Sequence, residues 1–215
     1  MFIELHAQSA FSFLEGAELP EAFASAAARL EMPAVALVDR DGVYGAARFA
    51  RAALGAGVTP LVGAEVTLAD GSRLPLLVED REGYQNLCRL ITRMKLGAPK
   101  GVAAAALDEL EPYAAGLVCL TGGTWGPLAL RLDAGDAEGA RDVLARLVSI
   151  FGSSSCYVEV QRHLDREQER ILQALVALAR AARVPLVASH QPLYARPEGR
   201  PLADIFKCIP EKTDL

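Results

Sequence analysis

The feature that most constrains the fold is the regular alternation of short apolar runs with longer segments of helical periodicity. The continuous apolar run 34–38 has the pattern of a strand that is buried on both faces, and the run 185–189 is also typical of a strand. Between such runs, segments such as 83–94 and 137–151 repeat apolar residues at helical spacing. Strands that alternate with helices usually pair in parallel. The pattern therefore predicts an α/β protein built on a parallel sheet.

The pattern also predicts the individual elements. We expect strands at residues 1–6, 34–38, 59–67, 74–78, 116–120, 156–161 and 185–189. We expect helices at residues 19–31, 43–54, 83–94, 107–112, 137–151, 165–182 and 202–208. The turn-rich stretch at 69–72 predicts that the strands on either side of it form a hairpin, and 97–101 is expected to be a loop.

Composition limits the class of protein. A chain of 215 residues with 52% hydrophobic residues is most simply one domain with an ample core, which we expect to span 1–215. The net charge of −5 argues against strong DNA binding by the chain alone. No apolar run approaches the length of a membrane span, and we expect neither a signal peptide nor a membrane partner. The four cysteines lack metal-ligand spacing, which favours reduced thiols in a cytoplasmic protein.

Polar residues recur where the predicted strands end. His6 and Gln8 follow the first strand, and Asp39 and Arg40 follow the second. Glu65 lies within the third strand. His163, His190 and Gln191 follow two later strands in the same way, and carboxyl ends of parallel strands meet at one edge. This recurrence favours a closed or nearly closed barrel, with a site at that edge.

Seven stretches of the chain, in this order, resemble the polymerase-and-histidinol-phosphatase (PHP) domain. They are ELHAQSAFSFLEG, ALVDRDGVYGAARFARAA, PLVGAEV, DREGYQNLCRLITR, YVEVQRHLDREQERI, VPLVAS and PEGRPLADIFKCI. The resemblance is closest to this domain at the N-terminus of error-prone bacterial C-family DNA polymerase III alpha subunits. It implies a distorted (β/α)7 barrel, similar to a TIM barrel. In metal-binding members it also implies a trinuclear zinc or manganese site that hydrolyses phosphoesters.

The chain departs from the family pattern at the metal-ligand positions. His6 keeps the first histidine of the first motif, but Gln8 replaces the second, and Arg40 replaces the histidine of an Asp-His pair that begins with Asp39. Glu65 is kept. Arg73 stands where a histidine is often found, and the final Asp-x-His motif reads Gln191-Pro192-Leu193.

These replacements change the chemistry of the predicted site. A leucine offers no lone pair, a glutamine offers only a weak neutral oxygen, and an arginine repels divalent cations. We therefore hypothesise that Arg40 takes the place of metal by pairing with Glu65 or with Asp39. No cofactor is expected, with zinc or manganese as the alternative.

Each remaining residue has a second interpretation. His6 is either a metal ligand or a histidine held in a vestigial cleft, and Glu65 is either a ligand or the partner of an arginine; the second reading is preferred for both. His163 is read as part of a surface loop before a helix cap at Asp165. His190 lies outside the family ligand positions and is a candidate compensating ligand.

The predicted vestigial cleft therefore consists of His6, Gln8, Asp39, Arg40, Glu65, His163, His190 and Gln191. We predict a domain without catalysis of its own that acts in DNA replication or repair as a structural and protein-interaction module. Its expected partners are a polymerase body or other replication or translesion proteins, toward which 197–215 would lead. The alternative is a metal-dependent phosphoesterase or 3′-to-5′ exonuclease that uses His6, Glu65, His163 and His190. A stand-alone protein recruited to translesion synthesis is a third possibility.

Overall fold

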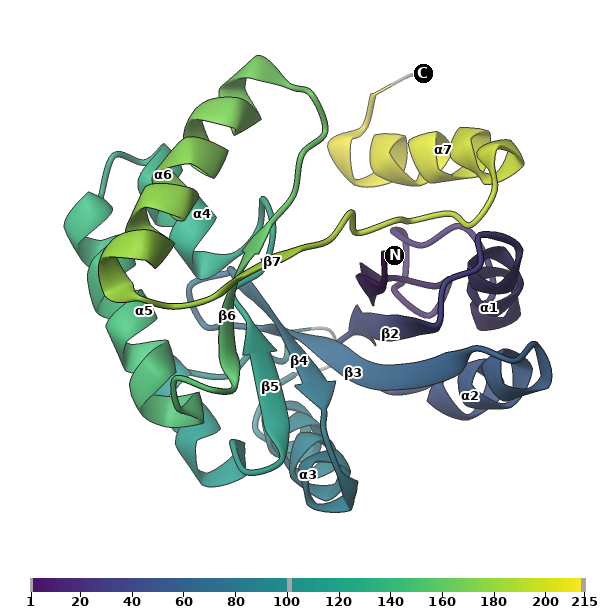
Figure 1. Cartoon of the computed structure of the whole chain (residues 1–215), viewed down its shortest axis with the longest axis horizontal. Coiled ribbons are helices and arrows are strands. Elements are labelled where there is room, and N and C mark those ends of the chain that lie inside the picture. The colour runs from purple at the N-terminus through teal and green to yellow at the C-terminus, as the bar shows by residue number, and fades with distance from the viewer. Residues whose placement is uncertain (1, 100–101, 214–215) are drawn as a thin grey trace. The chain divides into compact units, whose positions relative to one another are not determined.

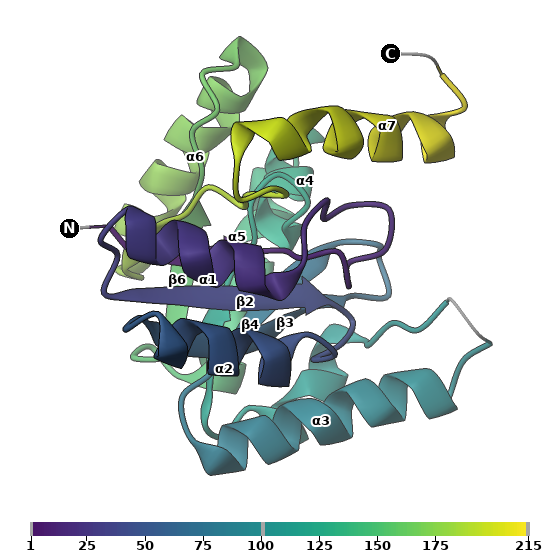
Figure 2. The same cartoon turned by 90° about the vertical axis from the view of Figure 1, so that its right-hand side faces the viewer.

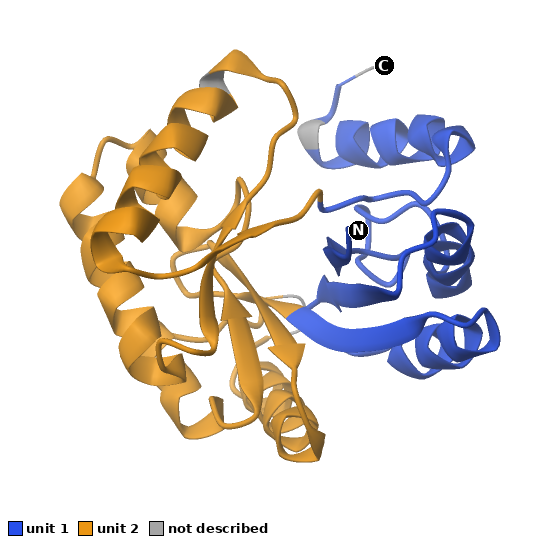
Figure 3. Cartoon of the chain, viewed as in Figure 1, with its two compact units in different colours: residues 1–64, 191–215 blue, residues 65–190 orange. Residues whose placement is uncertain are grey.

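The structure is a computed structural model that describes residues 2–99 and 102–213. The chain divides into two compact units (Figure 3). Unit 1 consists of residues 1–64 and 191–215, and unit 2 consists of residues 65–190. Each unit is described by itself below, and the single domain expected for 1–215 stays a prediction.

Strands and helices alternate along the described chain (Figure 1). The strands are β1 (Glu4–Ala7), β2 (Ala34–Arg40), β3 (Thr59–Thr67), β4 (Arg73–Val78), β5 (Leu117–Leu120), β6 (Cys156–Val160) and β7 (Leu186–Ala188). The α-helices are α1 (Pro20–Arg29), α2 (Ala46–Gly55), α3 (Arg81–Leu96), α4 (Pro127–Asp133), α5 (Ala137–Phe151), α6 (Arg166–Ala182) and α7 (Arg200–Glu211). Two 3₁₀ turns, η1 (Leu107–Tyr113) and η2 (Pro197–Gly199), complete the set.

Within residues 2–99 and 102–213, the strands follow one another in the sheet in their sequence order, β1 to β7. β1 and β2 pair in parallel, as do β5 with β6 and β6 with β7. β4 and β5 pair antiparallel, which agrees with the prediction that β4 is the returning strand of a hairpin in an otherwise parallel sheet. The cause is the tight turn after β3, in which Gly71 has a φ of 84° and the Leu68 amide donates to the Ser72 carbonyl at 2.8 Å. The turn reverses the direction of the chain before β4, and the chain direction reverses again between β4 and β5.

In unit 1, α1 contacts both α2 and β2, and Figure 2 shows the two helices beside that strand. α1 starts at Pro20, whose fixed φ suits a first helical turn. The contacts form because both helices turn small and aromatic residues inward. The core contains Ala7, Phe23, Ala24, Ala27, Val35, Leu37, Phe49, Ala53 and Val58.

In unit 2, the sheet is covered by longer helices. α5 contacts β5 and β6, α6 contacts β6, and α3 contacts β4 and β5. α3 begins where the Asp80 carboxylate accepts a hydrogen bond from the Gly83 amide at 2.8 Å, and Asp136 caps α5 in the same way through Gly139. The interior is filled mainly by leucines, including Leu74, Leu76, Leu87, Leu90, Leu117, Leu144 and Leu147.

Most predicted elements agree with the observed ones to within a few residues. The short helix α4 is absent from the prediction, and 107–113 is a 3₁₀ turn. Residues 97–99 of the predicted loop lie outside any helix or strand, and residues 100–101 fall outside the described part of the chain. No helix of the described residues is long and apolar enough to span a membrane.

Candidate functional site

In unit 1, two of the predicted ligand positions meet. Gln8 follows β1, and Gln191, whose φ is 50°, lies in the segment between β7 and α7. The Gln191 Nε2 donates to Gln8 Oε1 at 3.5 Å, a long hydrogen bond between two neutral amides. The Gln8 backbone N–H also donates to the Pro192 carbonyl at 3.2 Å, and Ala17 N–H to the Leu193 carbonyl at 2.7 Å. The family alignment therefore placed positions 8 and 191 together correctly, although neither residue carries charge here.

Asp39 is a buried carboxylate at the end of β2 that is held by neutral donors. Its Oδ1 accepts the Ser9 N–H at 2.7 Å, and both of its oxygens lie 2.9 Å from Ser9 Oγ. Ser12 Oγ adds a hydrogen bond to Oδ1 at 3.0 Å. Burial raises the pKa of Asp39, and the Ser9 and Ser12 hydrogen bonds act in the opposite direction.

The arginine next to Asp39 turns to another partner. The Arg40 guanidinium pairs with the Glu15 carboxylate and also donates to the Phe13 carbonyl at 3.4 Å. Glu15 follows the loop that carries Ser12, whose Oγ also accepts the Arg40 N–H at 3.0 Å. The hypothesis that Arg40 pairs with Glu65 or Asp39 is therefore wrong. The side chain is 30% exposed, which is more than a buried replacement for metal would be.

In unit 2, a different arginine pairs with Glu65. The Arg73 guanidinium lies 3.5 Å from the Glu65 carboxylate, and Glu65 itself is only 1% exposed. Arg73 also lies over the Trp125 ring, 5.5 Å from its centroid, a cation–π geometry. The Arg73 N–H donates to the Trp125 carbonyl at 2.8 Å, which fixes the start of β4 beside that ring. Glu65 is thus paired with an arginine, as expected, but through Arg73.

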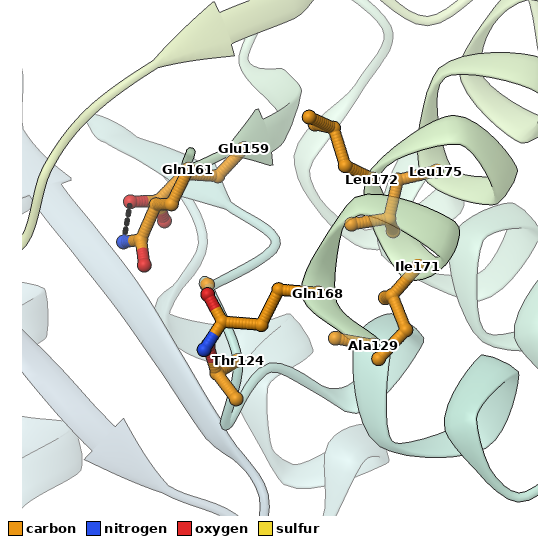
Figure 4. Close-up of a pocket in the computed structure, with 9 residues that line it drawn as sticks. Thr124, Ala129, Glu159, Gln161, Gln168, Ile171, Leu172 and Leu175 are labelled. Atoms are coloured by element: carbon orange, nitrogen blue, oxygen red, sulfur yellow. Dashed lines mark hydrogen bonds between the residues drawn. The ribbon is translucent and has the colours of Figure 1, made fainter. Parts of the chain in front are cut away.

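A buried carboxyl that the sequence reasoning missed lies in β6. Glu159 is fully buried and accepts hydrogen bonds from Ser189 Oγ and from Gln161 Nε2, the latter at 3.0 Å. The register that pairs Val160 with Ala188 places Gln161 beside Ser189, and Gln161 Nε2 donates to Ser189 Oγ at 3.1 Å. Figure 4 shows the bond from Gln161 to Glu159. A glutamate inside the apolar run CYVEV was the signal that could have found it.

The three histidines differ in burial. His6 is fully buried, and its backbone N–H donates to Glu4 Oε1 at 2.8 Å. His163, in the loop before α6, and His190, two residues after β7, are both exposed. The alternative ligand set of His6, Glu65, His163 and His190 therefore combines two buried with two exposed side chains.

These residues do not fit the metal centre that the resemblance implies. Both oxygens of Asp39 accept serine hydroxyls, Glu65 faces a guanidinium, and position 193 is a leucine. A guanidinium beside a carboxylate ligand opposes the binding of a divalent cation. In residues 2–99 and 102–213, no three His, Cys, Asp or Glu side chains are grouped so that they could hold a metal ion.

The four cysteines are free thiols, as the sequence predicts. Cys119 and Cys156 are register partners in β5 and β6 and are both buried. Burial raises the pKa of Cys119 well above its usual range, whereas the hydrogen bond from Cys119 lowers that of Cys156.

Known proteins of similar sequence are bacterial DNA polymerases. The chain is 39% identical to an error-prone DNA polymerase of Mycolicibacterium paratuberculosis over its whole length, and covers 21% of that protein. It is 34% identical to the DNA polymerase III subunit alpha of Pseudomonas aeruginosa, of which it covers 19%. The chain therefore spans about a fifth of the length of these relatives.

Two known structures of similar fold are described as a phosphoesterase and an amidohydrolase. A putative metal-dependent phosphoesterase from Bifidobacterium adolescentis matches with a TM-score of 0.58 and 14% identity, covering 91% of this chain and 89% of that one. An amidohydrolase from Chromobacterium violaceum matches with the same TM-score, 16% identity, and coverage of 91% of this chain and 88% of that one. At such identities the likeness shows the fold alone, and it confirms the expected α/β class of the PHP type.

The family model described as "PHP domain" matches residues 4–163, which is more than half of the chain. That range begins with β1 and ends just after β6, so it contains the strand ends at which His6, Asp39, Glu65 and Gln161 lie. This chain belongs to the PHP domain family.

Proposed function

We propose that this chain is a PHP domain without a metal centre, and that it serves a DNA polymerase alpha subunit of the error-prone type as a structural and protein-interaction module. The observation that carries the proposal is the Glu65–Arg73 ion pair. An acidic side chain that the family uses as a metal ligand is neutralised by a guanidinium. The guanidinium is anchored in turn on Trp125.

The other replaced positions support the same conclusion. Gln8 and Gln191 hydrogen-bond to each other as neutral amides, and Asp39 is held by hydroxyl groups. Amide and hydroxyl partners satisfy the hydrogen bonding of these groups, so they keep the local backbone in place without an ion. The fold and its polar contacts are thus maintained by the protein itself.

The partner we propose is the polymerase body, because the similar polymerases are about five times as long as this chain. Helix α7 offers the surface. Leu202, Ile205 and Ile209 recur at helical spacing on one face of α7, and each is between 41% and 52% exposed. Such a row of exposed aliphatic residues on one helix is typical of a protein contact. With this partner, the chain would act in DNA replication or repair in the cytoplasm.

The alternative function is metal-dependent hydrolysis of a phosphoester or of a DNA 3′ end. Its support is the fold shared with the B. adolescentis protein, which is described as a putative metal-dependent phosphoesterase. In this chain, the activity would require a site rebuilt around His6, Glu65, His163 and His190.

The deciding experiment measures metal content and hydrolysis together. The chain is purified without chelator, its zinc and manganese are measured by elemental analysis, and hydrolysis of p-nitrophenyl phosphate and of a single-stranded oligonucleotide is assayed with both metals added. We expect less than stoichiometric metal and no hydrolysis above the buffer rate. Two or three metals per chain with turnover would overturn the proposal in favour of the alternative.

A restored variant provides the matched control. It carries Gln8→His, Arg40→His, Arg73→His, Gln191→Asp and Leu193→His, which return the family ligand types to the aligned positions. We expect this variant to take up metal, which would show that the assay detects a competent site. If the restored variant stays metal-free while its circular dichroism remains native, the loss extends beyond the ligands to the shape of the cleft.

A further inference from the structure

Unit 1 contains a hollow on one face of α1 that the proposed function does not use. Ala22, Ser25 and Ala26 line it from the helix, and their helical spacing puts them on one face. Because these side chains are short, they leave a space of about 240 Å³ over the helix. One water molecule needs about 10–15 Å³ on this scale, so the hollow has room for a group of several atoms.

Two arginines from distant parts of the sequence line the same hollow. Arg29 belongs to the last turn of α1, and Arg196 lies directly before η2. Glu18 holds Arg196 in place, because its Oε1 accepts hydrogen bonds from Nε and Nη2 of Arg196 at 3.1 and 3.0 Å. The Arg196 side chain is still 57% exposed, so its remaining N–H groups are open to a ligand.

Arg29 is the less constrained of the two arginines. It is exposed, and among residues 2–99 and 102–213 its side chain has neither a hydrogen bond nor an acidic partner. Its guanidinium is always protonated and carries several N–H donors. Two guanidinium groups that line one hollow repel each other. An anion in the hollow would relieve that repulsion and would supply acceptors for the N–H groups of Arg29.

The charges at the hollow leave one positive charge without a balancing acid. Glu21 also lines the hollow, and its Oε1 accepts a hydrogen bond from Arg48 Nε at 2.7 Å. Glu18 balances Arg196 in the same way. These two acids answer two of the three arginines, and the charge of Arg29 is left over. The hollow is therefore suited to an anion of low charge.

The donors and the charge together select the class of anion. Guanidinium groups bind oxyanions through charge-assisted hydrogen bonds, and a single uncompensated charge favours a singly charged anion. A phosphodiester carries one charge, and its oxygens point in several directions from the phosphorus atom. This shape suits two guanidinium groups that approach from different elements. A carboxylate also carries one charge, but its two oxygens match the fork of a single guanidinium.

We propose that the hollow on α1 binds one phosphodiester group of a DNA strand through Arg29 and Arg196. The choice of DNA rests on the proposed function, since the similar proteins are DNA polymerases. The net charge of −5 limits a lone phosphate contact to weak binding, so the contact would add to the hold that a polymerase body has on its DNA. Such a contact positions DNA without reading its sequence.

The first test follows the arginine Nε–H signals of the whole chain by NMR during titration with dimethyl phosphate, a phosphodiester without sugar or base. We expect saturable shifts of the Arg29 and Arg196 signals. The signal of Arg51, an exposed arginine on α2 that does not line the hollow, should stay in place. Equal shifts of all three signals, no saturable shift, or equally tight binding of acetate would overturn the proposal. Metal content and the association through α7 are measured separately, so this failure would leave the proposed function standing.

A variant pair measures the contribution of Arg29. Arg29→Gln should weaken binding of the dinucleotide d(TpT), which has one phosphodiester, by about tenfold, the loss of one charge-assisted contact. Arg51→Gln is the matched control, because it changes the net charge equally and should leave the affinity unchanged. Arg29 has no partner among the described residues, so circular dichroism should show the native fold in both variants. Equal affinities of the two variants would contradict the assignment of the phosphate to this hollow.

A second probe distinguishes DNA from a phosphorylated partner protein. Nα-acetyl-phosphoserine methylamide carries a phosphomonoester, which is nearly doubly charged at neutral pH. Because the hollow has a single uncompensated charge, we expect d(TpT) to bind more tightly than this probe, with the difference lost in Arg29→Gln. Tighter binding of the phosphoserine probe would overturn the choice of DNA.

Discussion

At the scale of single residues, two buried acids of the predicted site have partners of different chemistry. Glu65 faces the full positive charge of Arg73, whereas Asp39 has the hydroxyl groups of Ser9 and Ser12. A neighbouring cation stabilises an ionised carboxylate more strongly than neutral donors do. The two acids therefore predict different responses to substitution and to pH.

The first prediction concerns Arg73. Arg73→Met keeps the length of the side chain but leaves Glu65 buried beside an apolar group. Because Arg73 is 20% exposed, we expect a loss of about 1–3 kcal/mol of unfolding free energy, below the value for a fully buried pair. Urea denaturation of both chains at neutral pH measures this difference in unfolding free energy.

Arg48→Met is the control for that prediction. Arg48 pairs with Glu21 at 2.7 Å on the surface, where both side chains are at least 40% exposed. An exposed pair contributes about 0–1 kcal/mol. Equal losses of unfolding free energy in Arg73→Met and Arg48→Met would mean that the ion pair does not stabilise the buried Glu65 carboxylate. Arg40 is also partly exposed, so we expect Arg40→Ala to lower the unfolding free energy by only about 1 kcal/mol.

The second prediction concerns the pH dependence that comes from Asp39. Burial raises the pKa of Asp39 in the folded state, so the folded chain binds this proton more tightly than the unfolded chain does. The contribution of Asp39 to the unfolding free energy is therefore largest at low pH. It falls as the pH rises from about 3.8, the ordinary pKa of an aspartate, through the raised pKa of the folded state.

Asp39→Asn removes this titration. The unfolding free energy of the native chain, minus that of the variant, should therefore decrease with rising pH across this window and stay constant above it. Urea denaturation at a series of pH values measures the difference. A difference that increases with pH would show that the hydrogen bonds from Ser9 and Ser12 outweigh burial.

At the scale of elements, the helix starts depend on close backbone contacts. A Cβ at Gly83, in the first turn of α3, would lie 1.8 Å from the Gly116 carbonyl oxygen, which is backbone and cannot rotate away. Gly116 itself has a φ of 71°, so it cannot be exchanged freely either. The start of α3 and the start of β5 are thus joined through two glycines.

The third prediction follows from this contact. Gly83→Ala should destabilise unit 2 by more than about 2 kcal/mol, because the backbone must shift to admit the methyl group. Gly55→Ala, at the end of α2, is the control. Its Cβ would meet nothing within 4 Å, so the higher helix propensity of alanine should leave stability equal or higher by about 0.5–1 kcal/mol. Thermal unfolding measures the stability of both variants. A melting temperature of Gly83→Ala equal to that of the native chain would contradict the argument.

The sequence predicts elements better than it predicts contacts between their side chains. β3 was predicted with its observed bounds, because a strand pattern leads into a glycine-containing turn. α4 was missed because it is only seven residues long and starts at a proline. The ion pair of Glu65 was expected, but its partner was assigned to Arg40. Which arginine reaches a carboxylate depends on strand register and on Trp125, and neither can be read from spacing in the sequence.

The same limit applies to the candidate site. The alignment of motifs predicted that positions 8 and 191 lie together, since both belong to one ligand set, and Gln8 and Gln191 do meet. It gave no reason to examine Glu159, which is not a ligand position of the resemblance. Its burial becomes visible only when the register of β6 and β7 places Ser189 and Gln161 around it.

At the scale of the whole molecule, the fourth prediction concerns the proposed contact with a polymerase body. Ile205→Asp with Ile209→Asp places two charges on the exposed face of α7. We expect binding to the M. paratuberculosis error-prone polymerase, with its own PHP region removed, to weaken by about tenfold or more. Sedimentation velocity measures the association, and circular dichroism checks that the fold is unchanged.

Leu54→Asp is the matched control, because Leu54 is 67% exposed and lies on α2 instead of α7. It should leave the association unchanged. Similar weakening by both changes would indicate general apolar adhesion, and no association of the native chain would contradict the docking proposal itself.

The contacts of residues 192–196 have a consequence for the order of folding during synthesis. The loop of residues 8–18 is tied to this late segment through the Gln8 and Ala17 amides, and Glu18 accepts hydrogen bonds from Ala195 and Arg196. A ribosome releases the chain from its N-terminus, so the loop of residues 8–18 lacks these partners until residue 196 has emerged. Unit 2 is continuous in sequence and has its whole length available earlier. The first segment to be translated is therefore among the last to gain its native contacts. In a nascent chain halted before residue 191, we expect unit 2 to resist protease while the N-terminal residues are cleaved.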